Sequence, residues 1–354
     1  MTEKIRDKIQ VAVIGARGYV GAELVRLLLS HPLVEITHLT SESYAGQEVS
    51  KIYPNLRKKI SISYEKLNLS QLTSAADLVF LALPHGNSFS IVPQLIEAGI
   101  KVIDTSGDFR LKDASLYQKW YHTPHLCPHL LPRAVYGLPE LYRTAIVNAS
   151  LVANPGCYPV SIILALAPLV KHQLVKRDEV IITSLSGASG AGTVVSSELL
   201  FCSLNNNIHA YKVGGFHQHL PEMEQELSRI AGGEFTITFL PHIIPLNRGI
   251  FSSIFLSPVK SLTVSDLQKI YQDFYEKEPF IRILPPDFFP EIKAVCNSNF
   301  CDIGFIIDEH SRKIVVISVL DNLIKGAAGN AIQNMNLILH WPENLGLDFP
   351  GIFP

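Results

Sequence analysis

A glycine-rich turn near the start of the chain constrains the fold more than any other feature. The apolar run Val11–Ile14, a predicted strand, leads into Gly15-Ala16-Arg17-Gly18-Tyr19-Val20-Gly21, and Tyr19–Leu29 has the spacing of an amphipathic helix. Such glycines let the backbone approach a pyrophosphate, while the helix start supplies free N–H groups and the positive dipole end. A plain tight turn is the alternative interpretation. The context favours a dinucleotide site made by Gly15, Arg17, Gly18, Tyr19, Val20 and Gly21.

The rest of the first 155 residues continues the alternation of strands and helices. Continuous apolar strands are typical of a parallel sheet that is covered on both faces, so we predict a doubly wound α/β domain. Residues 105–150, which contain four prolines, are expected to be rich in loops. The further predicted elements are strands at Glu35–Leu39, Asp77–Leu83, Lys101–Asp104 and Leu151–Ala153 and a helix at Ser88–Glu97.

The pattern changes after residue 156, where strands follow one another with few helices. This arrangement predicts an α+β domain with a mostly antiparallel sheet, followed by a last helix at Lys325–Leu339. The predicted strands are Val180–Leu185, Phe235–Leu240, Ile250–Leu256, Ile303–Ile307 and Ile314–Val319, and the predicted helices cover 159–171, 220–230 and 264–276.

Composition excludes several classes of protein. A chain of 354 residues that is 47% hydrophobic can build two domain cores, and its formal net charge of −2 gives no general attraction to nucleic acid or anionic membranes. The charged segment MTEKIRDKIQ has no signal-peptide pattern, and Pro168 interrupts the longest apolar stretch. Five cysteines without a CxxC pair favour reduced thiols in a cytoplasmic protein. We therefore expect a small-molecule partner, and no nucleic acid or membrane.

The residues after the second predicted strand are expected to contact the ribose of the dinucleotide. A domain that binds NAD has an acidic residue there. In this chain the hydroxyls of Thr40, Ser41 and Ser43 suit a 2′-phosphate, whereas Glu42 suits a ribose hydroxyl. The hydroxyl cluster favours NADP(H), with NAD as the alternative.

Cys157 follows the predicted turn Asn154-Pro155-Gly156 and begins a predicted helix. A thiol at a helix N-terminus feels the positive dipole end, which lowers its pKa toward physiological pH. The thiolate can attack an activated acyl carbon, and hydride from a neighbouring nicotinamide can reduce the resulting thioester. A buried cysteine in a turn is the alternative interpretation, and the local sequence does not decide between the two.

Histidines, an arginine and a glycine-rich loop are the other candidates. His217 and His219 precede a predicted helix, and His242 lies in an expected strand-end turn; each is a candidate acid or base. The His-x-His pair has no Cys, Asp or Glu at ligand spacing, so no metal site is predicted. Arg110 follows a predicted sheet strand, where a guanidinium can hold phosphate or carboxylate. The loop Ser186–Gly192 can approach a substrate or cofactor closely.

Eight segments, in the same order, resemble the N-acetyl-γ-glutamyl-phosphate reductase family, the arginine-pathway relative of aspartate-semialdehyde dehydrogenase. Together they extend through nearly the whole chain: VAVIGARGYVGAELVRLL, IDTSGDFRL, YGLPEL, NPGCYP, SGASGAG, HQHLPEMEQEL, PHIIPLNRGI and DNLIKGAAGNAIQNMN. The resemblance implies a Rossmann-type NADP-binding domain over 1–155 and 321–354, with a returning C-terminal helix. It also implies a catalytic and oligomerisation domain over 156–320, and a homodimer or homotetramer.

The resemblance further implies NADPH-dependent reduction of N-acetyl-γ-glutamyl phosphate, as a thioester on Cys157, to N-acetylglutamate semialdehyde and phosphate. His217 or His219 would be the acid/base. The other implied site residues are Arg110, Ser186, Gly187, His242 and Arg248 for the substrate, and Ser41, Ser43, Gly190 and Asn322 for the cofactor. Glu42 stands where the family often has a basic residue.

Two other interpretations stay open. A related semialdehyde dehydrogenase that acts on an aspartyl, aminoadipyl or carrier-linked acyl phosphate would share the same chemistry. A non-catalytic, dinucleotide-sensing regulator belongs to another class, and Cys157 with the His-x-His pair argues against it.

Overall fold

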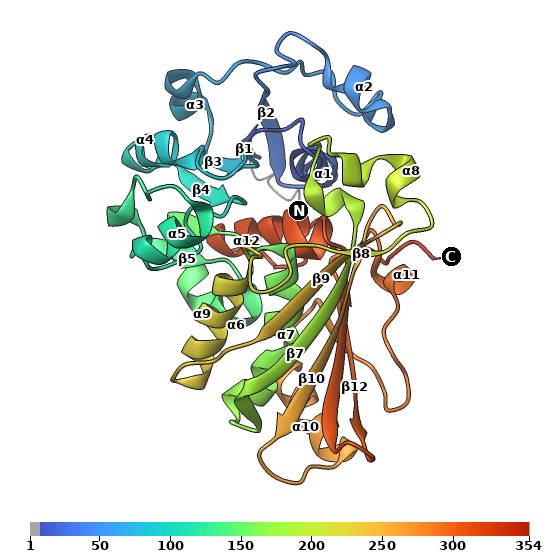
Figure 1. The fold of residues 1–354 in the computed structure, drawn as a ribbon. Helices are drawn as coiled ribbons and strands as arrows, with labels where there is room; N and C mark the ends of the chain where they lie inside the picture. Colours follow the sequence, from blue (N-terminus) through green and yellow to red (C-terminus); the bar gives the residue numbers. More distant parts are fainter. Residues whose placement is uncertain (1–7, 354) are drawn as a thin grey trace, which may run out of the picture. The chain divides into compact units, whose positions relative to one another are not determined.

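The computed structural model describes residues 8–353, which form two compact units (Figure 1). The first runs to Pro155 and resumes over Ala327–Asp348; the second covers Gly156–Gly326 and the chain from Phe349 onward. Most of the N-terminal segment MTEKIRDKIQ, on which the expectation of no signal peptide was based, lies outside the described residues.

The first unit contains a six-stranded sheet in which every pairing is parallel. Its strand order is β2-β1-β3-β4-β6-β5. The order reverses between β1 and β3, so the turn after β1 lies at a switch point, where such sheets bind ligands. The doubly wound prediction is confirmed. The strands are β1 (Ile9–Ile14), β2 (Val34–Thr40), β3 (Leu78–Leu81), β4 (Lys101–Asp104), β5 (Ala134–Tyr136) and β6 (Leu151–Ala153).

Residues 105–150 contain more regular structure than the sequence predicted. Helices α5 and α6 and the edge strand β5 all lie there. Pro139 is in the first turn of α6, where a missing N–H costs nothing, so this proline begins a helix instead of breaking one. The helices of this unit are α1 (Tyr19–Leu28), α2 (Val49–Ile52), α3 (Leu69–Ala75), α4 (Val92–Glu97), α5 (Ala114–Tyr121), α6 (Pro139–Val147) and α12 (Gly329–Ile338), with 3-10 turns at Pro54–Leu56, Ser88–Ser90 and Pro128–Leu130.

The C-terminal helix α12 is buried along its whole length in the first unit. Asn330 and Asn334 donate to the carbonyl of Gly137 at 2.7 and 2.8 Å and to Oδ1 of Asn154 at 2.8 and 3.1 Å. This amide network ties α12 to the segments that follow β5 and β6.

The chain returns to the first unit at Ala327, later than the predicted residue 321, and its last residues belong to the second unit. Residues 321–326 stay with the second unit because the Asp321 carboxylate accepts the N–H of Asn297 at 2.8 Å and its carbonyl accepts that of Gly326 at 2.9 Å. The N–H of Ile352 donates to Cys296 O at 3.0 Å, which holds the tail there. These non-local bonds leave no periodic signal in the sequence.

The second unit contains a seven-stranded mixed sheet in the order β11-β12-β13-β10-β7-β9-β8. Four of its six pairings are antiparallel, as expected. The strand predicted at Phe235–Leu240 instead begins at Thr238 and runs to Ile244. The strands are β7 (Val175–Gly187), β8 (His209–Ala210), β9 (Thr238–Ile244), β10 (Ile250–Pro258), β11 (Ile281–Ile283), β12 (Cys301–Asp308) and β13 (Lys313–Leu320).

Helix α7 is the buried centre of the second unit. Pro168 lies inside this helix and has no N–H for the carbonyl of Leu164, and the Tyr275 hydroxyl donates to that carbonyl at 2.5 Å. The helices are α7 (Cys157–Lys171), α8 (Phe201–Leu204), α9 (Leu220–Ala231), α10 (Val264–Tyr275) and α11 (Ile292–Val295), with 3-10 turns at Ala188–Ala191 and Ser197–Leu199 and a π-helical turn at Ile324–Ala328.

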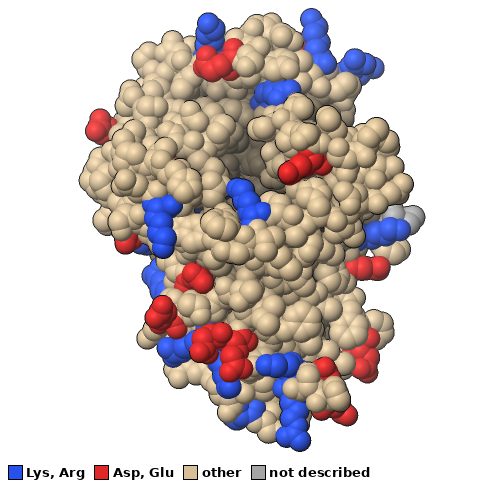
Figure 2. All heavy atoms as spheres, in the orientation of Figure 1, with Lys and Arg blue, Asp and Glu red and all other residues tan. Residues whose placement is uncertain are grey.

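Figure 2 shows basic and acidic side chains interspersed on the face that it presents. None of the helices in residues 8–353 is both long enough and apolar enough to span a bilayer.

Candidate active site

The candidate nucleophile is the first residue of helix α7. Gly156 is the N-cap of this helix, with extended backbone angles (φ −71°, ψ 154°), and its carbonyl accepts the N–H of Val160 at 3.0 Å. The Cys157 side chain is partly exposed. The thiol therefore lies at the positive end of the α7 dipole, as the sequence predicted.

Gly326 leaves room for the nucleophile. A Cβ on this glycine would lie 2.8 Å from the Cβ of Cys157 and 3.3 Å from its Cα. Gly326 belongs to the π-helical turn Ile324–Ala328, a rare conformation that is frequent at functional sites. Any side chain at residue 326 would displace the cysteine.

The imidazole of His219 packs against the glycine that precedes Cys157. A Cβ on Gly156 would lie only 2.4 Å from Nε2 of His219. His219 is partly exposed and is the N-cap of α9. The structure thus brings one of the two predicted histidines next to the nucleophile turn.

His217 is buried and is held on both ring nitrogens. Its Nδ1 accepts the N–H of His219 at 3.1 Å, and its Nε2 lies 3.3 Å from the hydroxyl of Tyr211. Burial, together with the smaller effect of the positive charge of Lys212, lowers the pKa of His217 to about 3. A neutral imidazole whose Nδ1 accepts carries its proton on Nε2, so His217 donates to Tyr211. The Tyr211 hydroxyl in turn donates to that of Tyr158 at 3.2 Å.

Glu222 contacts the nucleophile turn from the same helix as His219. Its Oε1 accepts the N–H of Gly156 at 2.8 Å, and its side chain is almost completely buried. Glu222 was not among the residues predicted from the sequence. One feature of the sequence could have indicated it. A glutamate three residues after an N-cap Ser or Thr usually caps its own helix, but here the N-cap residue is His219.

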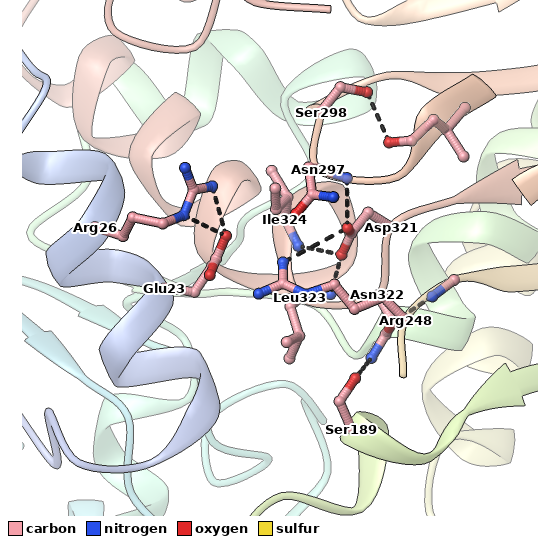
Figure 3. A network of polar contacts seen from close by, with 12 residues as sticks. Glu23, Arg26, Ser189, Arg248, Asn297, Ser298, Asp321, Asn322, Leu323 and Ile324 are labelled. Carbon is pink, nitrogen blue, oxygen red and sulfur yellow. Dashed lines mark hydrogen bonds and ion pairs between the residues drawn. The ribbon is translucent and has the colours of Figure 1, made fainter. Parts of the chain in front are cut away.

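The glycine-rich loop and the start of β10 are cross-linked by Asn322 (Figure 3). The Asn322 amide accepts the N–H of Gly249 at 2.8 Å through Oδ1 and donates to Oγ of Ser189 at 3.0 Å through Nδ2. A Cβ on Gly187 would lie 2.8 Å from the backbone nitrogen of Arg248, and one on Gly190 would lie 3.2 Å from Oγ of Ser186. These contacts bring Ser186, Gly187, Gly190, Arg248 and Asn322 into one cluster.

Arg248 in this cluster forms a long ion pair with a buried carboxylate. Its Nη1 lies 3.6 Å from Oδ2 of Asp321, and the arginine side chain remains a quarter exposed (Figure 3). Asp321 is fully buried and also accepts the N–H groups of Leu323 and Ile324 at 2.8 and 3.1 Å. The carboxylate orients the guanidinium without covering it.

His242 does not lie in a strand-end turn, as the sequence suggested. It lies within β9, where it pairs with Leu185 of β7 and Ala210 of β8. Its Nδ1 lies 3.4 Å from the hydroxyl of Thr183. The predicted strand ended at Leu240, whereas β9 continues through Pro241 to Ile244, the residue before Pro245.

The glycine turn of the first unit has the form that a pyrophosphate needs. Gly15 has φ +82°, and a Cβ there would lie 2.4 Å from the carbonyl oxygen of Ala82. A Cβ on Gly21 would lie 2.4 Å from Gly15 O, which shows how closely α1 approaches β1. The space beside Gly18, the N-cap of α1, is open by comparison: the nearest atom is 3.6 Å from its ideal Cβ. The turn therefore fits a dinucleotide phosphate.

Side chains around this turn leave a partly open surface. The guanidinium of Arg17 stacks on the ring of Tyr44 at 4.8 Å and donates to its hydroxyl at 3.3 Å. Tyr19 is exposed, and Val20 follows it in the first turn of α1. Ser41 and Ser43 follow β2, whereas the Glu42 carboxylate accepts the N–H of Leu67 at 3.3 Å.

Arg110 is buried beneath the loop that follows β4. Its Nε donates to the carbonyl of Asn154 at 2.8 Å and its Nη2 to that of Thr105 at 2.7 Å. Asp104, the last residue of β4, is fully buried, and its pKa is raised to about 6 by burial and by the charge of Asp108. Arg110 therefore has a structural role in the first unit, whatever it binds.

Two family models match the chain along the same division. The model described as semialdehyde dehydrogenase, NAD binding domain, matches residues 10–149, and the model described as semialdehyde dehydrogenase, dimerisation domain, matches residues 157–322. The N-acetyl-gamma-glutamyl-phosphate reductases of Citrifermentans bemidjiense and Geobacter sulfurreducens are 49% and 47% identical to the chain, over 98% of it and 100% of each relative. The chain belongs to the N-acetyl-gamma-glutamyl-phosphate reductase family.

Solved structures share the fold of this reductase family. Aspartate semialdehyde dehydrogenase II of Vibrio cholerae, complexed with ASA, has a TM-score of 0.71 at 19% identity, covering 94% of this chain and 99% of that one. Aspartate semialdehyde dehydrogenase with NADP from Candida albicans has a TM-score of 0.70 at 19% identity, covering 96% and 100%. The NAD binding domain of the family also agrees with the predicted nicotinamide dinucleotide cofactor.

Most residues predicted from the resemblance to this reductase family fall into three groups. One is the glycine turn of the first unit, the second is the cluster around Asn322, and the third joins Cys157, His217 and His219. Sequence reasoning missed the residues that hold the third group together: Gly156, Tyr158, Tyr211, Glu222 and Gly326.

Proposed function

We propose that this protein reduces N-acetyl-γ-glutamyl phosphate to N-acetylglutamate semialdehyde and phosphate with NADPH, as in arginine biosynthesis. One observation carries the proposal: a partly exposed cysteine begins a helix, and a histidine ring packs on the residue before it. The printed names of relatives nearly half identical over their full length give the substrate class.

Cys157 acts as the nucleophile of the reaction. Its thiolate attacks the acyl carbon of the acyl phosphate. The tetrahedral oxyanion then collapses to a thioester as phosphate leaves. Backbone N–H groups at the start of α7 are suited to stabilise that oxyanion. NADPH, which the turn Gly15–Gly21 would hold, would supply the hydride that reduces the thioester carbon. The thiohemiacetal then collapses, and the aldehyde leaves as the sulfur departs.

His219, and not His217, is the acid/base in this proposal. The departing sulfur needs a proton, and the His219 ring packs against the residue bonded to Cys157. His217 is unsuited because its Nδ1 accepts a backbone N–H and burial lowers its pKa to about 3, so it stays neutral at physiological pH.

Anionic groups of the substrate would be held by the arginines that the sequence indicated. Arg248 keeps a quarter of its side chain exposed beside Ser186 and Gly187, which supports a contact with carboxylate or phosphate. His242, half-buried in β9, borders the same strand pair. Arg110 is included as a second anion-binding residue, although two of its donors are already used on carbonyl groups.

The cofactor would be held by the glycine turn Gly15–Gly21 with Arg17, Tyr19 and Val20. Ser41 and Ser43 are the expected contacts of a 2′-phosphate, and the bond from Leu67 to Glu42 engages the carboxylate that would favour NAD. Gly190 and Asn322 would border the nicotinamide. The preference for NADP over NAD is tested by comparing kcat/KM for the two cofactors in wild type and in Ser43→Asp.

A homodimer or homotetramer is part of the proposal. Ile306, Val315, Phe255 and Ile181 are in register across four strands of the second unit. Three of these, Ile181, Phe255 and Ile306, are 56%, 40% and 37% exposed, an apolar row that suits burial against a second copy. Phe255→Asp should shift the mass measured by light scattering toward the monomer, whereas an unchanged mass would exclude this face. Five cysteines without a disulfide fit a reducing, cytoplasmic compartment.

The decisive experiment measures phosphate-dependent reduction of NADP⁺ by purified protein with N-acetylglutamate semialdehyde. Aspartate and aminoadipate semialdehydes are the competing substrates. Cys157→Ser should bind NADPH normally yet lose about 10³-fold or more in rate. Cys202→Ser, at an exposed cysteine of α8, is the matched control and should retain full rate. Dinucleotide binding without turnover of any semialdehyde would favour a regulator instead.

A further inference from the structure

Helix α9 has an unusual N-terminus. His219 is its N-cap and Glu222 is its third residue. A glutamate at this position normally accepts the N–H of its own N-cap residue. Here Nδ1 of His217 accepts that N–H at 3.1 Å, and the Glu222 carboxylate reaches out of its helix to the N–H of Gly156 at 2.8 Å.

We propose that Glu222 is a positioning residue that fixes the Gly156–Cys157 turn against His219, and that His217 permits this by capping α9 in its place. The inference rests on the proposed function for its catalytic consequence only. Glu222 does not touch the substrate in this scheme; it acts through the glycine that precedes the nucleophile.

The cost of burying Glu222 argues for a specific role. A carboxylate that is 1% exposed is stable only if hydrogen bonds replace its water. A negative charge near Cys157 opposes formation of the thiolate, so the charge of Glu222 does not itself activate the thiol. The bond from the Gly156 N–H to the Glu222 carboxylate gives this buried residue a structural role, because it joins the starts of α7 and α9.

Two contacts from one turn of α9 meet at the same glycine. Glu222 binds the N–H of Gly156, while the His219 ring occupies the space that a Cβ of Gly156 would fill. With the N–H held and the ring packed on the α-carbon, the thiol at residue 157 and the imidazole have little freedom to separate.

His217 supports the arrangement from the other side. Its Nε2 donates to Tyr211, and Tyr211 donates to Tyr158, the neighbour of Cys157. The same imidazole therefore caps α9 and reaches the first turn of α7 through two hydroxyls.

The test compares Glu222→Ala with Glu222→Gln, which keeps a carbonyl acceptor but loses the charge. Glu226→Ala is the matched control, since Glu226 is buried one turn later on the same helix. One measurement is kcat and KM for the semialdehyde. The other is the rate at which iodoacetamide alkylates Cys157 in the free protein, followed by peptide mass because Cys202 is also exposed.

We expect Glu222→Gln to stay near wild type and Glu222→Ala to fall about 10- to 100-fold below it in kcat, the range for losing a hydrogen bond to a charged group. KM for NADP⁺ should not change. The two Glu222 variants should also differ in alkylation rate, because any effect of charge is common to both, whereas Glu226→Ala should alkylate normally.

Equal alkylation rates in the two Glu222 variants would overturn the inference, as would a kcat in Glu222→Ala equal to that in Glu222→Gln. Circular dichroism and thermal unfolding show whether each variant is folded. If the alanine variant unfolds, the isosteric Glu222→Gln still decides, because a kcat 10-fold or more below wild type in the folded glutamine variant would overturn the inference. If wild type turns over no semialdehyde, the proposed function fails while the alkylation comparison still decides the positioning role.

Discussion

The change Gly156→Ala tests the site with a single methyl group. The backbone angles of Gly156 (φ −71°, ψ 154°) are open to any residue, so alanine meets no backbone strain there. Its Cβ would, however, lie 2.4, 2.7 and 2.8 Å from Nε2, Cδ2 and Cε1 of His219. Ordinary contact begins at 3.4 Å, so the ring must move by about 1 Å, since 3.4 − 2.4 = 1.0.

A displacement of about 1 Å at a catalytic group can cost about 100-fold in rate. We therefore expect Gly156→Ala to lower kcat for the semialdehyde by about that factor while leaving KM for NADP⁺ unchanged. The free energy of unfolding should fall by only about 1 kcal/mol, the cost of alanine at an N-cap. Gly18→Ala, at the open N-cap of α1, measures that cost without a clash and serves as the control for stability.

Steady-state kinetics and urea denaturation of the same preparations give both numbers. A Gly156→Ala enzyme with kcat within threefold of wild type would refute the reasoning, because the ring would then have moved by about 1 Å without consequence. If the loss in kcat, expressed as a free energy, were matched by an equal loss in the free energy of unfolding relative to Gly18→Ala, the cause would be a general disturbance of α7 instead.

Three further predictions concern residues other than those of the turn before Cys157. Gly15→Ala combines positive φ with a 2.4 Å approach to a carbonyl oxygen and should lower the free energy of unfolding by about 3 kcal/mol. Gly46→Ala has positive φ but open space and should lower it by only about 1 kcal/mol, with both values measured by urea denaturation. Asp104 has a pKa raised from 3.8 to about 6, so the folded state keeps the proton to a higher pH than the unfolded state does. The free energy of unfolding should therefore fall as pH rises from about 4 to 6, by an amount on the order of 3 kcal/mol. Asp104→Asn should flatten that decline, and an unchanged slope of the free energy of unfolding against pH would contradict the prediction. His217→Asn should lower kcat yet leave the pH midpoint of kcat/KM unmoved, and a shifted midpoint would identify His217 as the titrating group.

The elements that the sequence predicted well are those whose signal is local. The strand, glycine turn and helix at Val11–Leu28 follow from apolar spacing and from the backbone freedom of glycine. The structure adds the reason for two of the glycines: Gly15 has positive φ and no room for a Cβ, and Gly21 only lacks room. Gly18 has neither constraint, with φ −63° and the nearest atom 3.6 Å from its ideal Cβ. The position of Cys157 at a helix start was predictable for the same reason, because a turn sequence precedes an apolar run.

Some elements were not predicted because proline was interpreted as a sign of a loop or turn. Prolines at 128 and 139 suggested loops, but each begins a helical turn, where the missing N–H is unimportant. His242 was expected in a strand-end turn before Pro245, yet its strand pairs on both sides. A proline limits one hydrogen bond at its own residue, and it does not decide what its neighbours do.

The contacts that the sequence did not predict are bonds between distant segments. Glu222 and Gly156 are 66 residues apart, and Asn322 joins residues 189 and 249. Periodicity shows that a residue faces a core, but not which donor it meets there. The His-x-His pattern is a local clue to one of these bonds: Nδ1 of His217 accepts the N–H of the N-cap residue His219, which a glutamate at the third helix position would otherwise accept. The Glu222 carboxylate instead accepts the N–H of Gly156, and the His219 ring packs on the same glycine, so one residue connects the proposed acid/base to the proposed nucleophile.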